Sequence, residues 1–142
     1  MTSPDVEPVE TQTRHEQIMA EAAGVRDEPD LVGLLGEATA IFRVNELLNW
    51  EVARAAAVGE ISVADASSSK VFASDHVQHL IADLIAAVHR HGDAGEPGTK
   101  ELLDYLDSQA KRNLVLTFGG GVQEVQRELI AMFGLGLPRV PR

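Results

Sequence analysis

The chain has 142 residues, a formal net charge of −10 and no cysteine. This length predicts a single domain with a hydrophobic core of moderate size, and the lack of cysteine excludes a disulfide or a thiolate site. The acidic excess argues against nucleic acid as a partner, and no apolar run approaches the roughly 20 residues of a membrane span. Aromatic residues make up 4% of the chain while alanine and leucine are abundant, which favours helices. The lack of cysteine is typical of a cytoplasmic protein.

Residues 1–26 are predicted to form an acidic leader. Residues 1–13 combine prolines, hydroxyl residues and acids without apolar periodicity, so we expect them to be disordered. A short helix is expected over about 14–25, with Ile18 and Met19 as its large apolar anchors.

Residues 27–142 are predicted to form the folded domain, which opens with a long helix from about 29 to 58. Asp27-Glu28-Pro29-Asp30 signals its start, because proline suits the first turn and acids suit the positive end of the helix dipole. Asn45 and Asn49 interrupt its apolar face and would need hydrogen-bond partners if buried, and Gly59 ends it. The apolar stripe has three-four spacing and comprises Leu31, Leu34, Leu35, Ala38, Ile41, Phe42, Leu48, Val52, Ala55 and Ala56.

Three further helices are expected after this one. A capping box from Ser62 to Asp65 begins the second long helix, over about 63–91, and Thr99 is the expected N-cap of a helix over about 100–114. A last helix runs from about 122 to 133 after a run of glycines. The stripe of the second helix comprises Val63, Ala66, Ala73, Val77, Leu80, Ile81, Leu84 and Val88. Short connections between such helices favour an all-α, antiparallel four-helix-bundle-like fold.

The titratable side chains give a weak case for a metal site. His76 and His79 share a helix face with Asp75 and Asp83, which is a conceivable patch of ligands. No fixed third ligand accompanies them, so a solvated helix face is the better interpretation and no metal site is predicted.

Other conspicuous side chains receive structural roles. His89 and His91 lie near a helix C-terminus and would compensate its dipole when protonated. Glu124 and Arg127 are three residues apart, a spacing that predicts a surface ion pair. The large aromatic side chains are expected in the core or at an interface: Phe42, Trp50, Phe72, Phe118 and Phe133.

The run Gly119-Gly120-Gly121 precedes the last helix. The first amides of a helix have no partner within it, and glycines allow close approach, so an anion or a flavin pyrophosphate or ribityl group fits such a turn. The alternative is a tight turn between two helices.

Several segments resemble the C-terminal domain of the acyl-CoA dehydrogenases, flavoenzymes that oxidise the Cα–Cβ bond of acyl thioesters. The signature is the segment 117–131, with its glycine run and Glu124-Val125-Gln126-Arg127, followed by Leu135-Gly136-Leu137-Pro138-Arg139. Segments 43–49, 55–60 and 69–74 look like the family's two long helices. The resemblance covers about Leu31 to Arg139 and implies the family's helical C-terminal domain.

The resemblance implies a site with contacts to FAD but without a catalytic side chain. Gly119, Gly120, Gly121, Val122 and Glu124 stand where the family contacts its flavin. Counting back from the arginine of the signature places Gly120 where many family members carry their general base, and glycine cannot accept a proton. Other members carry the base on an earlier helix, which this sequence does not match. Val122 replaces a common threonine, whereas Glu124 fits a common variant. A second flavin loop, Gln-x-x-Gly-Gly-x-Gly, is expected to be lost, because Ala86 and His89-Arg90 occupy its positions.

The functional expectation is a protein related to FAD-dependent α,β-dehydrogenation of acyl-CoA thioesters. The family's N-terminal and β domains do not match any part of this sequence, so we expect it to be inactive alone and to act as a subunit or remnant. Its partner would be a full-length acyl-CoA dehydrogenase-type subunit or a second copy. Two alternatives stay open: a non-enzymatic helical interaction module, and an active flavin-binding homo-oligomer.

Overall fold

The computed structural model describes residues 17, 19–21 and 23–139, and this part of the chain contains helices and no strand. The elements are α2 (Pro29–Ala57), α3 (Val63–His91), α4 (Pro97–Phe118), α5 (Gln123–Leu129) and a π-helix, η1 (Ile130–Gly134). The all-α prediction is therefore confirmed. The disorder expected for residues 1–13 falls outside the described residues.

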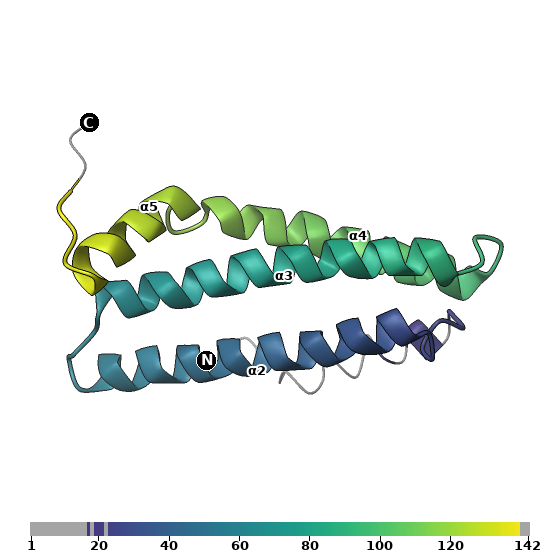
Figure 1. Ribbon diagram of the computed structural model, residues 1–142, viewed down its shortest axis with the longest axis horizontal. Helices are drawn as coiled ribbons and strands as arrows, with labels where there is room; N and C mark the ends of the chain where they lie inside the picture. Colours follow the sequence, from purple (N-terminus) through teal and green to yellow (C-terminus); the bar gives the residue numbers. More distant parts are fainter. Residues whose placement is uncertain (1–16, 18, 22, 140–142) are drawn as a thin grey trace, which may run out of the picture.

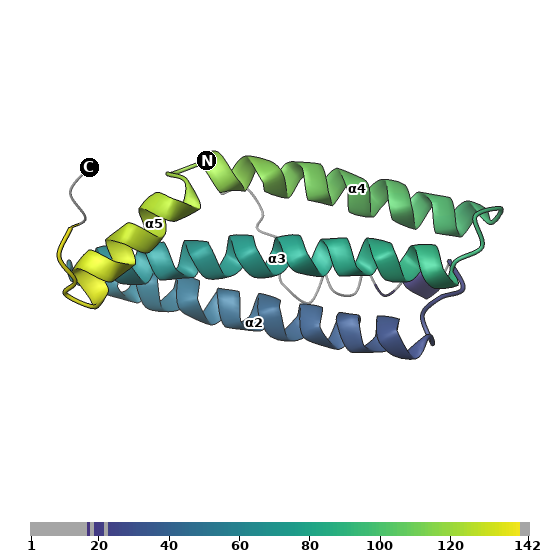
Figure 2. The same ribbon diagram turned by 45° about the horizontal axis from the view of Figure 1, so that its top comes forward.

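Helix α3 is the centre of the molecule. It packs against α2 on one side and against α4, α5 and η1 on the other (Figure 1). Figure 2 shows α4 running along α3 and α5 crossing obliquely towards the start of α3. The long helices are antiparallel neighbours, as the short connections predict.

The buried core occupies one half of this arrangement. It joins the first half of α2, the second half of α3 and the first half of α4 with residues just before α2. Its fully or nearly buried members are Ala20, Ala23, Val25, Leu31, Leu35, Ala38, Ile41, Phe42, Leu80, Leu84, Ala87, Val88, Leu102 and Leu106. The apolar stripe predicted along all of α2 is thus buried only as far as Phe42. Beyond it Leu48, Val52 and Ala55 are half-buried, and Ala56 is exposed. Val63, the first residue of the stripe predicted on α3, is exposed as well.

The ends of α2 and the start of α3 follow the sequence signals. Pro29 stands in the first turn of α2, and Gly59 has a φ of 78° just after its last residue, a conformation that favours glycine. The Ser62 hydroxyl accepts a hydrogen bond from the Asp65 amide at 3.1 Å. The predicted boundaries of both long helices are therefore confirmed within one residue.

Helix α4 begins earlier and ends later than predicted. Its N-cap is Glu96, with Pro97 in the first turn. Thr99 is not a cap: its side chain is buried, and its hydroxyl donates to the Ala23 carbonyl at 3.5 Å. Proline fixes φ for a first helical turn, and this outweighs the capping tendency of threonine. The helix continues to Phe118, where the glycine run stops it.

The last helix is shorter than predicted and ends in a π-turn. Regular α-helix stops at Leu129, and Leu135 N then donates to the Ile130 carbonyl at 3.2 Å, five residues back. Gly134 lies against the start of α3, where a Cβ would come within 3.1 Å of the Ala64 Cβ. The wider turn brings this glycine against α3.

The short helix expected over 14–25 is present only in part. Gln17 and residues 19–21 are helical, and the chain then turns at Gly24, whose φ is 69°. Ala20 and Val25 are the buried anchors of this segment. Ile18, the other expected anchor beside Met19, lies outside the described residues.

Candidate functional site

The glycine turn joins α4 to α5. Gly119 caps α4, with its amide donating to Val115 O at 3.1 Å. Gly120 and Gly121 then have φ values of 75° and 107°, which residues with a Cβ rarely adopt. The Gly121 amide donates to Phe118 O at 3.3 Å and closes the turn.

All three carbonyl oxygens of this turn accept hydrogen bonds from side chains. The Lys70 ammonium, from α3, donates to the carbonyls of Gly119 and Gly121. The side-chain amide of Gln126, from α5, donates to the Gly120 carbonyl at 2.7 Å. Gln126 is buried, so this bond satisfies both a buried side chain and the turn.

The two central glycines face different surroundings. A Cβ on Gly121 would lie 2.9 Å from Gln126 Nε2, closer than a real contact allows. A Cβ on Gly120 would meet only Lys70 Nζ within 4 Å, at 3.6 Å. The space beside Gly120 is therefore open and has a cation at its edge.

A polar strip on α3 holds both arms of the turn. Ser74 Oγ accepts from Gln123 Nε2 at 3.1 Å, and Gln78 Nε2 donates to Thr117 Oγ1 at 2.7 Å. With Lys70, these residues lie at every fourth position of α3, on one face of the helix. Sequence reasoning missed this strip, because α3 has many other polar side chains and these three do not stand out among them.

Arg127 makes an ion pair across helices. Its guanidinium donates to the Asp75 carboxylate of α3, and also to Gln123 at 3.4 Å. The surface pair predicted between Glu124 and Arg127 is therefore replaced by a contact that ties α5 to α3. Spacing along one helix does not show which neighbouring helix offers a stronger partner.

His76 and His79, in the middle of α3, are turned to their own helix. Nδ1 of His76 lies 2.9 Å from Phe72 O, and Nδ1 of His79 lies 2.7 Å from Asp75 O. The His76 ring also stacks on Phe72, with centroids 4.2 Å apart. Within the described residues, no group of three or more His, Asp or Glu side chains is placed to hold a metal ion.

His91 makes contacts beyond the end of its own helix. It lies 2.9 Å from the Asp30 carboxylate and 3.3 Å from Glu28, at the start of α2. Arg90 donates to Asp30 at 2.8 Å. The hydrogen bonds from Arg90 and then His91 lower the pKa of Asp30 from 3.8 to about 2.

The asparagines on α2 form a polar contact with α3. Asn49 accepts a hydrogen bond from the buried Ser69 hydroxyl at 2.9 Å. Its amide donates to Asn45 at 3.4 Å. Both asparagines thus find partners at the edge of the helix pair rather than in the apolar core.

Large aromatic side chains divide between core and surface. Phe42 is buried and Phe72 packs against the core, as expected. Trp50, Phe118 and Phe133 are 68%, 71% and 61% exposed. The exposed ones lie on different elements, α2, α4 and η1.

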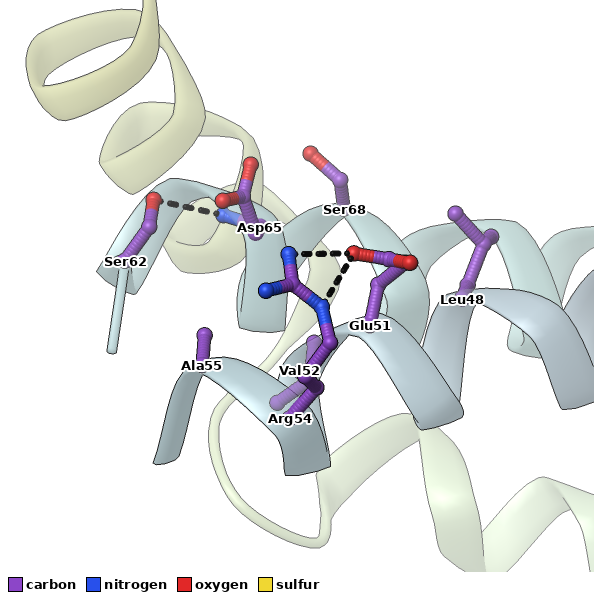
Figure 3. Close-up of a pocket in the computed structure, with 8 residues that line it drawn as sticks. All are labelled: Leu48, Glu51, Val52, Arg54, Ala55, Ser62, Asp65 and Ser68. Atoms are coloured by element: carbon purple, nitrogen blue, oxygen red, sulfur yellow. Dashed lines mark hydrogen bonds and ion pairs between the residues drawn. The ribbon is translucent and has the colours of Figure 1, made fainter. Parts of the chain in front are cut away.

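Two pockets lie away from the glycine turn. The first, of about 320 Å³, lies between the end of α2 and the start of α3 (Figure 3). In that view the exposed Glu51–Arg54 ion pair, at 3.0 Å, stands at its edge. The second, of about 200 Å³, lies where α3 meets α4 and includes Thr99. Sequence reasoning predicted neither pocket.

The first amides of α5 have no hydrogen-bond partner within the helix. The N-cap of α5, Val122, provides no side-chain hydrogen bond, and the first bond of the helix runs from Gln126 N to Val122 O. The amides of Gln123 and Glu124 therefore precede any acceptor within the helix. Glu124 is exposed and adds an acceptor oxygen beside these donors.

Comparison with known proteins gives a consistent result. Residues 12–135 match the family model described as acyl-CoA dehydrogenase, C-terminal domain. The chain is 53% identical over 116 residues to acyl-CoA dehydrogenase FadE29 of Mycobacterium tuberculosis, covering 82% of this chain and 30% of the relative. It is 36% identical over 107 residues to FadE26 of the same organism, covering 70% and 26%. It thus spans less than a third of either relative.

Solved structures show the same fold. A structure titled Tcur3481-Tcur3483 steroid ACAD matches with a TM-score of 0.76 and 27% identity over 93% of this chain and 35% of that one. The ChsE4-ChsE5 complex from Mycobacterium tuberculosis matches with a TM-score of 0.71 and 31% identity, over 94% of this chain and 36% of that one.

None of the described helices combines the length and hydropathy that crossing a membrane requires.

Proposed function

Because the chain belongs to the acyl-CoA dehydrogenase family, through its C-terminal helical domain, we propose that it assembles with a flavin-bearing subunit of that family. In this assembly it supports the FAD-dependent dehydrogenation of an acyl-CoA thioester. The observation that carries the proposal is the glycine turn. Its three carbonyls accept hydrogen bonds from side chains of α3 and α5, yet it has no side chain at Gly120, where many members of the family carry their base.

The residues that would contact the cofactor are the backbone of 119–121 with Val122 and Glu124. FAD, when bound, supplies a hydride acceptor for the acyl chain. The amides of Gln123 and Glu124, which have no acceptor within α5, would donate to ring carbonyl or ribityl oxygens. The exposed Glu124 carboxylate accepts from a hydroxyl but repels a phosphate, so the turn suits the ring or ribityl part better than the pyrophosphate.

The chain lacks the proton acceptor that the chemistry requires at Gly120. Removal of a general base typically costs a factor of about 10²–10⁴ in rate. A carboxylate of another chain would therefore have to remove the α-proton. On this proposal the isolated chain does not turn over.

Two observations support a partner, and the first of them favours an unlike one. The solved relatives are titled as two-component proteins, the ChsE4-ChsE5 complex and the Tcur3481-Tcur3483 steroid ACAD. Exposed apolar side chains also occur in groups, Leu47 with Trp50 on α2 and Leu114, Val115 and Phe118 at the end of α4, and such groups suit surfaces that a partner covers. The second title also points to bulky, ring-bearing thioesters as the substrate class of the assembly.

The test is co-purification. The chain should be co-expressed with a full-length acyl-CoA dehydrogenase-type subunit, taken from the neighbouring reading frame where one exists. We expect a complex with a flavin band in its visible spectrum, whereas the isolated chain, after FAD addition and desalting, stays colourless. Clean separation of the two chains would overturn the proposal. A flavin band retained by the isolated chain would contradict its dependence on a partner.

The exposed aromatic side chains also suit a second candidate, an active homo-oligomer with flavin bound between copies. This candidate predicts acyl-CoA-dependent reduction of an artificial electron acceptor by the isolated chain with FAD. An absence of that activity in a chain that is shown to be folded and dimeric would remove it. It would leave a non-enzymatic helical module as the remaining alternative.

A further inference from the structure

The backbone of the glycine turn is unfavourable by itself. Two successive residues, Gly120 and Gly121, have positive φ, and glycine loses more conformational freedom on ordering than other residues. A run of three glycines therefore adopts many backbone conformations unless other groups fix it. In this structure, side-chain hydrogen bonds fix it.

Lys70 holds two alternate carbonyls of the turn, and Gln126 holds the one between them. Hydrogen bonds from a charged donor are stronger than neutral ones. Lys70 comes from the central helix α3, whereas Gln126 belongs to α5, the helix that follows the turn. Lys70 therefore joins the carbonyls of the turn directly to α3, whereas the other contacts with α3 are made by the two arms, through Thr117 and Gln123.

We infer that Lys70 is a positioning residue: its ammonium fixes the glycine turn on α3 and sets where the open face of Gly120 stands. Lys70 Nζ lies 3.6 Å from the point where a Cβ on Gly120 would be, so it also places a positive charge beside that face. Any effect of this charge on a bound cofactor rests on the function proposed above. The positioning of the turn by Lys70 is independent of that function.

The primary test uses hydrogen exchange on the isolated chain. Lys70→Met removes the ammonium with little change in side-chain length. Lys111→Met is the matched control, because Lys111 is an exposed lysine of α4 paired with Asp107 in its own helix. We expect the hydrogen-bonded amides of Gly119, Gly121 and Gln126 to exchange roughly tenfold faster or more in K70M, and K111M to match the wild type. Equal exchange in K70M and the wild type would overturn the inference.

The conservative variant separates positioning from general packing. Lys70→Arg keeps a cationic donor that can reach two carbonyls, so it should restore most of the protection of the turn. If K70R exchanges as fast as K70M while both melt like the wild type, the inference is wrong.

To keep the test independent of whether K70M folds, the wild-type ammonium is also observed by nitrogen-15 NMR. A hydrogen-bonded Lys70 ammonium should give a protected signal, and its absence would overturn the inference.

A second arm addresses the cofactor. In a complex with a flavin-bearing subunit, K70M should lose flavin or shift its visible absorption, while K111M should not. An unchanged spectrum in K70M would overturn the link to the cofactor. If no complex forms with the wild-type chain, the proposed function fails, and the exchange result alone decides the role of Lys70.

Discussion

At the scale of single residues, Gly120 is the most informative position to change, because the space beside it is open and the Lys70 ammonium lies at its edge. Gly120→Glu places a carboxyl group at the position of the family's base, at a cost of roughly 1–2 kcal/mol for positive φ in a residue with a Cβ. Its Cβ would lie 3.6 Å from Lys70 Nζ, so the opposite charge should lower the pKa of the introduced carboxyl. We expect G120E to gain no dehydrogenase activity alone.

The carboxyl can be followed by NMR as the pH changes. In the double variant with Lys70→Met the cation is absent, so the introduced carboxyl should titrate at higher pH than in G120E. Equal titration in the two variants would show that Lys70 does not face this position.

Gly121 tests the fit between the turn and Gln126. Gly121→Ala would place a Cβ 2.9 Å from Gln126 Nε2 on a residue whose φ is 107°. Strain and loss of the bond to Gly120 O should cost about 1–3 kcal/mol. Gly33→Ala is the control, since Gly33 lies within α2 with nothing within 4 Å of a Cβ, and it should stabilise by about 0.5–1 kcal/mol. Urea unfolding measures both. Similar effects of the two changes would contradict the packing described here.

At the scale of elements, the start of α2 and the end of α3 are joined by Asp30, Arg90 and His91. Because the pKa of Asp30 is lowered from 3.8 to about 2, its contribution to stability is complete above the ordinary carboxyl pKa. It is lost as the pH falls through the folded value.

Asp30→Asn should therefore be less stable than the wild type at neutral pH, and this difference should shrink as the pH falls from about 3.8 towards about 2. Thermal melts at a series of pH values measure it. Glu37→Gln, at an exposed acid of the same helix, should show a smaller difference. If D30N still melts at a lower temperature than the wild type below the pKa of Asp30 in the folded protein, the stabilisation does not come from the ionised Asp30 carboxylate.

Elements whose ends depend on local signals were predictable. Pro29, Gly59 and the Ser62 cap fix α2 and α3 within their own sequence. The start of α4 has a local signal too, Pro97 in its first turn, but Thr99 was taken as the cap. The burial of Thr99 against Ala23, far away in the chain, could not be predicted. The polar strip of α3 was missed because its partners also lie far away in the chain. Lys70 and Gln78 are recognisable as a support only when the C-terminal end of α4 is known to lie beside them.

At the scale of the whole molecule, periodicity predicted an all-helical fold but not which faces stay open. The stripe of α2 continues past Phe42 with suitable spacing, yet the second half of the helix has too few neighbours to bury it. Burial depends on what packs opposite a face, and a single helix does not encode that. The glycine turn shows the reverse case: its residues were identified as a possible flavin contact, and this remains a prediction, whereas the side chains that hold it came from the structure.

The exposed face of α2 gives the last prediction. Leu47 and Trp50 are 64% and 68% exposed, so Trp50→Gln should change the unfolding free energy of the isolated chain by no more than about 0.5 kcal/mol. If a partner covers this face, the same change removes a large aromatic contact and should weaken the complex by about 2 kcal/mol or more. Ala40→Gln, at another exposed position of α2, is the control. Sedimentation velocity over a dilution series measures the association. A complex of unchanged affinity in W50Q would place the partner on another face, leaving the apolar end of α4 around Phe118 as the surface to test.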